Sequence, residues 1–256
     1  MLQFENLRAG YDGVEKLHGI SFGLRQGALT AIIGPNGCGK STLMKCAAKL
    51  MEPSGGAVIL DGRPLNTLTE RERAQSISYM PQSRIVPDTS VRHLVTHGRY
   101  PHLQWGRSLR REDREIVEAV LRRAGLMDYA GRNVRLLSGG ERQRAYLAMM
   151  LAQQTPVMLL DEPTTYLDLS NQFQLMRLLR DLCREGRAAA VVMHDLALAL
   201  EFADEIVLLD AGKCAAKGTP EEVYRSGAIQ EVFGIQIQCV LGDKYIFYPR
   251  EQEESK

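Results

Sequence analysis

The sequence predicts an α/β fold in which a mostly parallel sheet is flanked by helices. The first observation behind this prediction is a set of short runs that are apolar on successive residues, at 29–33, 157–160, 188–193 and 206–209. Strands with this pattern are buried on both faces, which is typical of a parallel sheet covered by helices. The second observation is that longer amphipathic stretches alternate with these runs, as they do where helices connect parallel strands.

The N-terminal part of the chain has a different pattern and predicts an antiparallel β patch. Strand-like segments lie at 3–7, 21–24 and 57–60, and Asp-Gly pairs stand at 12–13 and 61–62. Asp-Gly is a pair that tight hairpin turns favour, so these segments are expected to pair as antiparallel strands.

A helical segment is predicted in the middle of the chain. Between residues 84 and 137 no strand-like run occurs, and apolar residues recur at spacings of three and four, as at Val91, Leu94 and Val95. We therefore expect a single domain over residues 1–240, with a core at 1–83 and 145–240 and an inserted helical subdomain at about 84–144. Residues 241–256 are expected to form a C-terminal strand and a disordered tail.

The composition limits the classes of function. The 256 residues are 45% hydrophobic, and 32 Lys and Arg against 31 Asp and Glu give a net charge of +1. This balance argues against nucleic acid as a partner, because phosphate contacts need an excess of basic residues. No apolar stretch reaches the roughly 18–20 residues of a membrane span, and no signal peptide is evident. Five dispersed cysteines predict reduced thiols, so a soluble, intracellular chain is expected.

The strongest motif follows the first buried run. Residues 34–42 match G-x4-G-K-[ST], a loop that wraps nucleotide phosphates between a strand and a helix. Its glycines let backbone N–H groups face phosphate oxygens, Lys40 is expected to reach the β- and γ-phosphates, and Ser41 to hold Mg²⁺. A glycine-rich turn that only caps a helix is the alternative. The expected ATP-binding residues of the loop are Gly34, Pro35, Asn36, Gly37, Cys38, Gly39, Lys40, Ser41 and Thr42.

Two acidic residues stand at the end of another buried run. Asp161 and Glu162 follow residues 157–160, and ligands of open α/β sheets bind at the carboxyl ends of the strands. We expect Asp161 to contribute to the Mg²⁺ site and Glu162 to polarise the water that attacks the γ-phosphate. The alternative is that both acids only begin a turn, which Pro163 would favour.

A third motif, Leu-Ser-Gly-Gly-Glu-Arg-Gln-Arg at 137–144, opens a predicted helix. Ser138 and Glu141 fit a helix capping box, which needs no ligand. A capping box does not account for Gly139 and Gly140, because each glycine in a helix costs about 1 kcal/mol of propensity. Close approach of another molecule does account for them, and a helix N-terminus with free N–H groups binds anions. The sequence therefore predicts a second phosphate-binding device.

Taken together, these motifs resemble those of the ATP-binding cassette (ABC) ATPases, and the resemblance covers nearly the whole chain. Residues 34–42 resemble the Walker A loop, 137–141 the signature motif and 157–162 the Walker B strand. Four single residues match the adenine-stacking aromatic, the Q-loop, the D-loop and the switch histidine of the family: Tyr11, Gln82, Asp168 and His194. The resemblance implies a P-loop NTPase core with ATP and Mg²⁺ as cofactors.

The resemblance also implies roles for these residues. Glu162, His194 and Gln82 would be catalytic, and Gln82 would join Ser41 and Asp161 at the metal. Two copies of the chain would pair head-to-tail, with ATP between the Walker A loop of one copy and the signature of the other. The residues expected to contact nucleotide outside the Walker A loop are Tyr11, Ser138, Gly139, Gly140 and Asp168.

Several of these residues have simpler explanations when they are taken alone. Tyr11 beside Gly10 would be a turn aromatic, and a single histidine after an apolar strand, such as His194, is usually structural. The helical segment also has more basic than acidic residues over 84–114, which indicates a solvated face or a surface for a partner or anionic lipid. The arginines concerned are Arg84, Arg92, Arg99, Arg107, Arg110, Arg111 and Arg114.

A finer resemblance is to the ATPase subunits of bacterial importers for ferric siderophores, haem and cobalamin, on segments 97–102, 151–156 and 161–168. It implies an ATPase that drives uptake of an iron(III)-siderophore chelate through a separate integral membrane permease, with a substrate-binding protein as indirect partner. The chain would lie peripherally at the cytoplasmic side of the bacterial plasma membrane. Haem or cobalamin import is one alternative, and a soluble ABC ATPase of iron–sulfur cluster assembly is a rival of another class.

Overall fold

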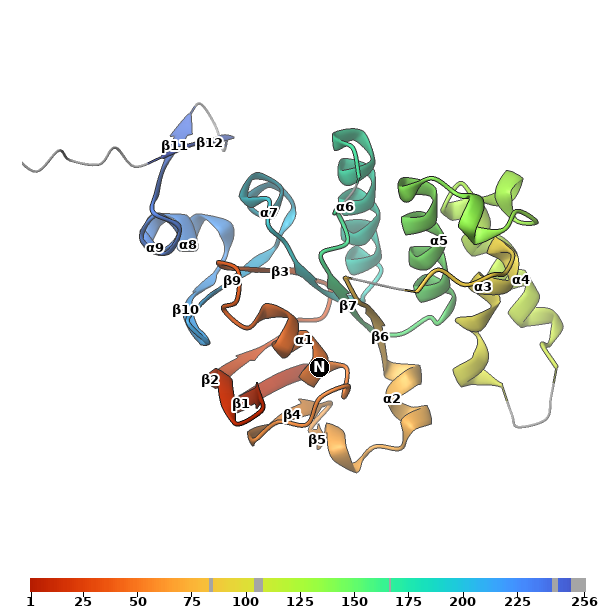
Figure 1. The fold of residues 1–256 in the computed structure, drawn as a ribbon, viewed down its shortest axis with the longest axis horizontal. Coiled ribbons are helices and arrows are strands. Elements are labelled where there is room, and N and C mark those ends of the chain that lie inside the picture. The colour runs from red at the N-terminus through yellow and green to blue at the C-terminus, as the bar shows by residue number, and fades with distance from the viewer. Residues whose placement is uncertain (83–84, 104–107, 166, 241–243, 250–256) are drawn as a thin grey trace, which may run out of the picture.

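The computed structural model describes residues 1–82, 85–103, 108–165, 167–240 and 244–249, and its centre is a six-stranded sheet (Figure 1). The strand order is β10-β9-β3-β8-β7-β6, and all strands are parallel except β10 at one edge. The strands are β3 (Leu29–Ile33), β6 (Ile77–Met80), β7 (Val157–Asp161), β8 (Ala188–Val192), β9 (Glu205–Asp210) and β10 (Lys213–Gly218). The parallel sheet expected from the four buried runs is confirmed, since β3, β7 and β9 contain three of them and β8 contains all of the fourth except Met193.

Two strands of this sheet were not predicted. β6 contains Ser78 and Tyr79, which interrupt its apolar run, although Ser78 is buried and its hydroxyl accepts a hydrogen bond from Thr155 Oγ1 at 2.7 Å. β10 alternates exposed and half-buried residues because it lies at the sheet edge, and two of its six residues are lysines. Continuous burial therefore identifies central strands better than edge strands.

The N-terminal antiparallel patch is also confirmed. β1 (Leu2–Tyr11), β2 (Val14–Gly23), β4 (Gly55–Leu60) and β5 (Arg63–Pro64) form a separate sheet in the order β2-β1-β4-β5. The two Asp-Gly pairs connect β1 to β2 and β4 to β5, as their turn chemistry predicts.

The six-stranded sheet is covered on both faces. On one face lie α1 (Lys40–Ala47) and the antiparallel sheet, and on the other lie helices of the second half of the chain (Figure 1). Each face of the sheet has its own hydrophobic cluster. Val157 and Leu159 belong to the cluster on the side of α1 and the antiparallel sheet, and Met158 and Leu160 belong to the larger cluster on the side of the other helices. This alternation explains why every residue of β7 is buried.

A helical segment packs at the side of this core, as the sequence predicts. α3 (Val91–His97) and α4 (Arg111–Arg123) pack against each other and against α5 (Gly139–Ala152), which in turn contacts the core (Figure 1). The remaining helices and strands are α2 (Glu70–Ser76), α6 (Leu169–Arg184), α7 (Leu196–Phe202), α8 (Pro220–Arg225), α9 (Ala228–Phe233), β11 (Ile235–Val240), β12 (Lys244–Pro249) and the 3-10 turns η1 (Leu65–Thr67), η2 (Tyr100–His102), η3 (Met127–Tyr129) and η4 (Val134–Leu136). The tail at 250–256 lies outside the described residues.

The arginines of this segment are not a uniform solvated face. Arg99 is only 5% exposed, and its guanidinium contacts Asp113 Oδ1 at 3.0 Å and the Ala152 carbonyl at 2.7 Å. Arg99 thereby joins the end of α3 to the start of α4 and to the C-terminal end of α5, where a helix dipole favours a cation. It is a structural residue and does not belong to a docking surface.

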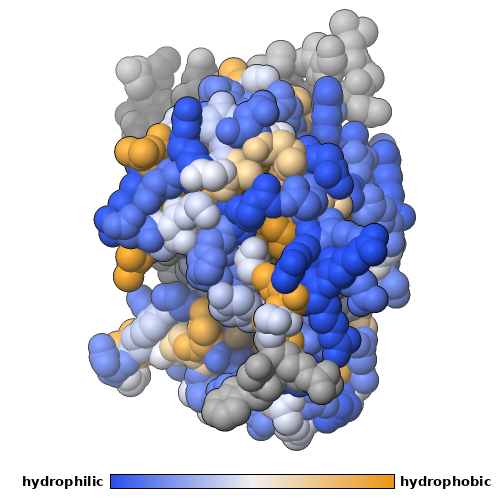
Figure 2. Space-filling model, turned by 90° about the vertical axis from the view of Figure 1, so that its right-hand side faces the viewer, coloured by the Kyte–Doolittle hydropathy of each residue, from blue (hydrophilic) through white to orange (hydrophobic). Residues whose placement is uncertain are grey.

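Two further arginines on this side of the molecule are paired at its surface. Arg92 contacts Glu118, and Arg111 Nε lies 2.7 Å from Glu115 Oε1. Figure 2 shows this side as mainly hydrophilic, with small separate hydrophobic spots. Arg84 and Arg107 lie outside the described residues.

We predict that Arg99→Ala lowers the free energy of unfolding by about 3–5 kcal/mol, because it leaves Asp113 buried without its partner. Urea unfolding followed by circular dichroism measures this. The matched control is Arg111→Ala, which breaks an exposed pair and should cost less than about 0.5 kcal/mol. Similar costs for the two variants would contradict the structural role of Arg99.

Candidate nucleotide-binding site

The strand order brings the predicted site residues to one edge of the sheet. β3, β8, β7 and β6 are consecutive neighbours and parallel, so their carboxyl ends lie together. The phosphate loop follows β3, His194 follows β8, Asp161 and Glu162 end β7, and Gln82 follows β6. Residues up to 160 positions apart in the chain therefore converge at one edge, as expected for ligand sites of parallel sheets.

The loop at 34–39 fits tightly between β3 and α1 and leaves no room for side chains at two glycines. A Cβ atom on Gly34 would lie 2.1 Å from the Leu209 carbonyl oxygen, and one on Gly39 would lie 2.5 Å from a methyl of Leu17. Gly39 also has φ +106°, which side chains rarely permit. The loop is thus fixed from behind by β9 and β2, with its other side free to receive a ligand.

Lys40 is the first residue of α1, and its side chain turns back into the loop. Its Nζ donates to the carbonyl oxygens of Gly34 at 2.7 Å and Pro35 at 2.8 Å. The residue is buried, with 6% of its surface exposed. The amine is consequently placed at the centre of the loop that the sequence motif assigns to phosphate.

Ser41 and Asp161 bring two oxygen donors together. Ser41 Oγ lies 3.3 Å from Asp161 Oδ1, and the hydroxyl of Tyr79 lies 3.5 Å from Oδ2. Burial raises the pKa of the Asp161 carboxyl above its ordinary value, and the nearby charge of Glu162 acts in the same direction, against the hydrogen bond from Ser41. A buried carboxylate beside a hydroxyl suits a hard cation such as Mg²⁺.

In the described part of the chain, no cluster of three or more His, Cys, Asp or Glu side chains is arranged to hold a metal ion. At nucleotide sites, Mg²⁺ usually takes one or two protein carboxylates and completes its shell with phosphate oxygens and water, so it needs no such cluster.

Glu162 is held between Gln82 and His194. Gln82 Nε2 donates to Glu162 Oε2 at 2.6 Å, and His194 Nε2 lies 2.5 Å from Oε1. Glu162 has φ +51°, a strained conformation for a residue with a side chain, of the kind that occurs at functional sites. Glu162 therefore contacts both of the other residues for which the resemblance implies a catalytic role.

One open hollow of about 200 Å³ connects the loop to Glu162. Tyr11 borders it with 42% of its surface exposed, and the Lys45 amine lies 3.2 Å from the Tyr11 hydroxyl. Tyr11 is the residue to which the family resemblance gives the adenine-stacking role. The lining residues are Tyr11, Lys16, Asn36, Gly37, Gly39, Lys40, Ser41, Thr42 and Glu162.

Ser138, Gly139, Gly140 and Asp168 do not line this hollow. Ser138 caps α5, with its hydroxyl accepting from the Glu141 N–H and Glu141 Oε2 accepting from the Ser138 N–H, so the predicted capping box exists. Ser138 and Gly139 remain exposed at the start of that helix. The resemblance assigns these residues to ATP held by another copy of the chain, which the structure of one chain does not test.

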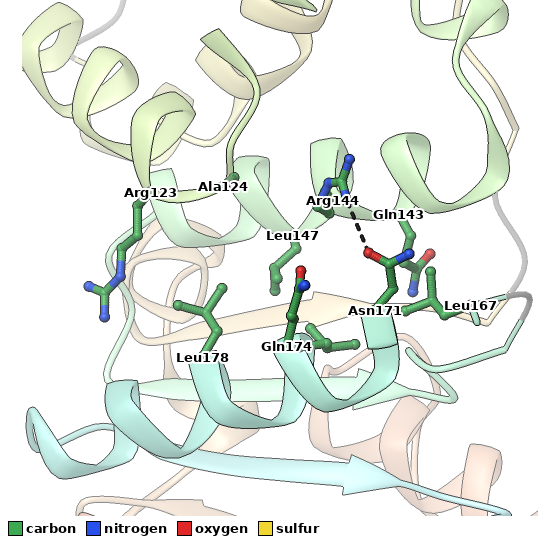
Figure 3. Close-up of a pocket in the computed structure, with 10 residues that line it drawn as sticks. Arg123, Ala124, Gln143, Arg144, Leu147, Leu167, Asn171, Gln174 and Leu178 are labelled. Atoms are coloured by element: carbon green, nitrogen blue, oxygen red, sulfur yellow. Dashed lines mark hydrogen bonds between the residues drawn. The ribbon is translucent and has the colours of Figure 1, made fainter. Parts of the chain in front are cut away.

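Asp168 caps α6, accepting hydrogen bonds from the backbone and side-chain nitrogens of Asn171 at 2.8 Å. Asn171 also accepts from Arg144 Nη1 at 3.1 Å, which ties the start of α6 to α5 (Figure 3). Behind this contact, a mainly apolar cavity of about 140 Å³ lies between α5 and α6, with Leu147 and Leu178 pointing into it (Figure 3). None of the predicted site residues lines that cavity.

Comparison with known proteins identifies the family. A family model described as "ABC transporter" matches residues 17–165, which is more than half of the chain. The chain belongs to the ABC transporter family. Among its relatives, the ferric enterobactin transport ATP-binding protein FepC of Escherichia coli is 41% identical over 241 residues, 93% of this chain and 89% of FepC. The petrobactin import ATP-binding protein FpuC of Bacillus anthracis is 39% identical over 91% of this chain and 86% of FpuC.

Other comparisons place the ABC ATPase among importers and dimeric cassettes. The hemin import ATP-binding protein HmuV of Pseudomonas aeruginosa is 40% identical over 93% of this chain and 94% of HmuV. An ABC transporter solved in an inward-facing conformation matches at a TM-score of 0.83 and 27% identity, over 97% of this chain and 96% of that one. A dimeric ATP-binding cassette bound to ADP and Pi matches at 0.75 and 27%, over 86% and 99%. The ABC ATPase fold predicted from the sequence is therefore confirmed.

None of the helices in the described part of this ABC ATPase is long and apolar enough to cross a bilayer.

Two residues at the site were not predicted from the sequence. Lys16 borders the hollow, and Tyr79 contacts Asp161 from the unpredicted strand β6. The motif order gives no signal for either residue, because each is placed by strand pairing.

We predict that Asp161→Asn raises the thermal midpoint of the nucleotide-free protein at pH 7.5. The pKa of this carboxyl is raised in the folded protein, so above that pKa its ionised form lowers the free energy of unfolding. This loss of stability disappears below the ordinary pKa of about 4, because the carboxyl is then protonated in the folded and the unfolded protein alike. The gain should therefore vanish near pH 4. Melting curves at both pH values, with and without MgATP, measure this.

The same substitution should abolish the stabilisation that MgATP gives the wild type. An Asp161→Asn protein that melts below the wild type at pH 7.5 without nucleotide would contradict the burial argument.

Proposed function

We propose that this ABC ATPase drives uptake of an iron(III)-siderophore chelate through a separate integral membrane permease, bound at the cytoplasmic side of a bacterial plasma membrane. The observation that carries the ATPase half is the contact of Glu162 with both Gln82 and His194 beside the phosphate loop. The substrate half is supported by near full-length relatives named for ferric enterobactin and petrobactin. A substrate-binding protein would be an indirect partner.

Phosphoryl transfer to water asks the protein mainly for positioning and charge stabilisation. Lys40 and the backbone N–H groups of the loop would hold the phosphates, while Tyr11 would stack on the adenine. Mg²⁺, held by Ser41 and Asp161 with Gln82 near the γ-phosphate, would neutralise phosphate charge. Glu162 would orient and deprotonate the attacking water, and His194 would hold Glu162 and contact the γ-phosphate.

The complete site would need a second copy of the chain. Ser138, Gly139 and Gly140 are exposed or half-exposed at the N-terminus of α5, whose free N–H groups favour an anion. In a head-to-tail pair, this helix end would close over ATP that is held by the partner. Asp168 at the start of α6 would lie beside the same interface.

Haem is the second candidate substrate, because HmuV is 40% identical over nearly the whole chain. The helical segment would contact the permease in either case. Tyr100, half exposed on η2, is the aromatic residue of segment 97–102 that remains available for that contact, since Arg99 is buried.

Glu162→Gln should bind ATP but hydrolyse it about 10²–10⁴ times more slowly, because the amide keeps its size and loses its basicity. Since hydrolysis would normally reopen the pair, size-exclusion chromatography with ATP should show a dimer for the variant and mostly monomer for the wild type. Glu231→Gln, at an exposed position on α9, is the control and should behave as wild type. Hydrolysis by Glu162→Gln at the wild-type rate would show that Glu162 is not the catalytic base, and His194 would be the next candidate.

Uptake measurements test the substrate. Cells that lack their own importers and express the chain with its permease and binding protein should accumulate radiolabelled iron(III)-siderophore, and Glu162→Gln should abolish this uptake. Haem uptake in the same cells should stay at background. Haem uptake without siderophore uptake would overturn the proposed substrate and leave the ATPase assignment intact.

A further inference from the structure

The chain that follows Gln82 is held by hydrogen bonds at residues 88–92. Backbone hydrogen bonds join residues 89–92 to residues 130–134, directly before the signature, and Asp88 contacts Asn133 and Arg135 at 2.7 and 2.8 Å. Gln82 itself is bound to Glu162 at the end of the sheet. The segment therefore connects the catalytic carboxylate to the part of the chain that leads into α5.

Ile85 is the first described residue after Gln82. Ile85 is 93% exposed, so packing of its side chain does not hold the main chain in place. Its carbonyl oxygen accepts a hydrogen bond from the hydroxyl of Tyr146 at 2.9 Å. The main chain at this point is thus held through a polar contact and not through burial of its own side chain.

Tyr146 is itself well fixed. It lies in the middle of α5, its ring belongs to the large hydrophobic cluster, and only 7% of its surface is exposed. The same helix contacts the turn after Glu162, where Gln143 Nε2 donates to the Pro163 carbonyl at 2.5 Å. The position of the Tyr146 hydroxyl is consequently set by α5.

We propose that Tyr146 is a positioning residue for Gln82. Three residue steps of chain span at most about 11 Å, so holding the Ile85 carbonyl limits how far Gln82 can move from Glu162. Because the holding group stands on α5, a displacement of that helix is passed to Gln82. This inference rests on the proposed catalytic roles of Gln82 and Glu162.

Tyr146→Phe tests it, because the variant keeps the ring in its cluster and removes only the hydroxyl. ATP hydrolysis by the full chain should fall about 2- to 10-fold in kcat, the range of a single hydrogen bond, with the Kd for ATP unchanged. The control is Tyr224→Phe, a partly buried tyrosine on α8 outside the hollow, which should keep the wild-type kcat. A wild-type kcat in Tyr146→Phe would overturn the proposal.

A double-mutant cycle separates positioning from a merely structural role. In a Gln82→Ala background, Tyr146→Phe should cause no further loss of kcat, because its effect passes through Gln82. Multiplied losses in the double variant would overturn the role of Tyr146 while leaving that of Gln82 intact. Wild-type hydrolysis by Gln82→Ala alone would overturn the assignment of Gln82, and this proposal with it.

Discussion

Parallel pairing of four neighbouring strands is the constraint on which the site depends. Because β3, β8, β7 and β6 run in one direction, their following loops must lie at one edge, whatever their distance in sequence. Burial on both faces holds this arrangement, since alternate residues of each strand belong to different hydrophobic clusters. The polar groups at the edge, from Lys40 to His194, are thus carried by the least deformable part of the molecule.

The helical segment is connected to that edge through α5. Its internal stability comes from apolar contacts and from one buried ion pair, Arg99 with Asp113, in which the guanidinium also takes up a carbonyl at the end of α5. It contacts the core through apolar residues of α5 and through polar contacts, among them Gln143 with the Pro163 carbonyl, Arg144 with Asn171 on α6, and Tyr146 with the Ile85 carbonyl.

The sequence predicted the central strands, the antiparallel patch and the phosphate loop, because continuous apolar runs, Asp-Gly turns and the glycine motif are local signals. β6 could not be predicted, since the burial of Ser78 depends on a hydrogen bond from Thr155. Arg99 was expected at the surface because its partners, Asp113 and Ala152, lie 14 and 53 positions away in the sequence. The sequence gives no signal for Tyr146, and only the fold shows that its hydroxyl reaches a residue 61 positions earlier. The proposed contact of Ser138 with ATP would depend on a second chain, which one sequence can suggest only by resemblance.

The placement of Lys40 has a consequence for the choice of nucleotide. Its amine already has two good acceptors within the protein, the carbonyls of Gly34 and Pro35, so a nucleotide would compete with the protein for this cation. A triphosphate or diphosphate offers charged oxygens that replace both hydrogen bonds with stronger ones. A monophosphate offers nothing at the β position and would leave the amine where it is. Lys40 would therefore favour nucleotides with at least two phosphates, whatever their base.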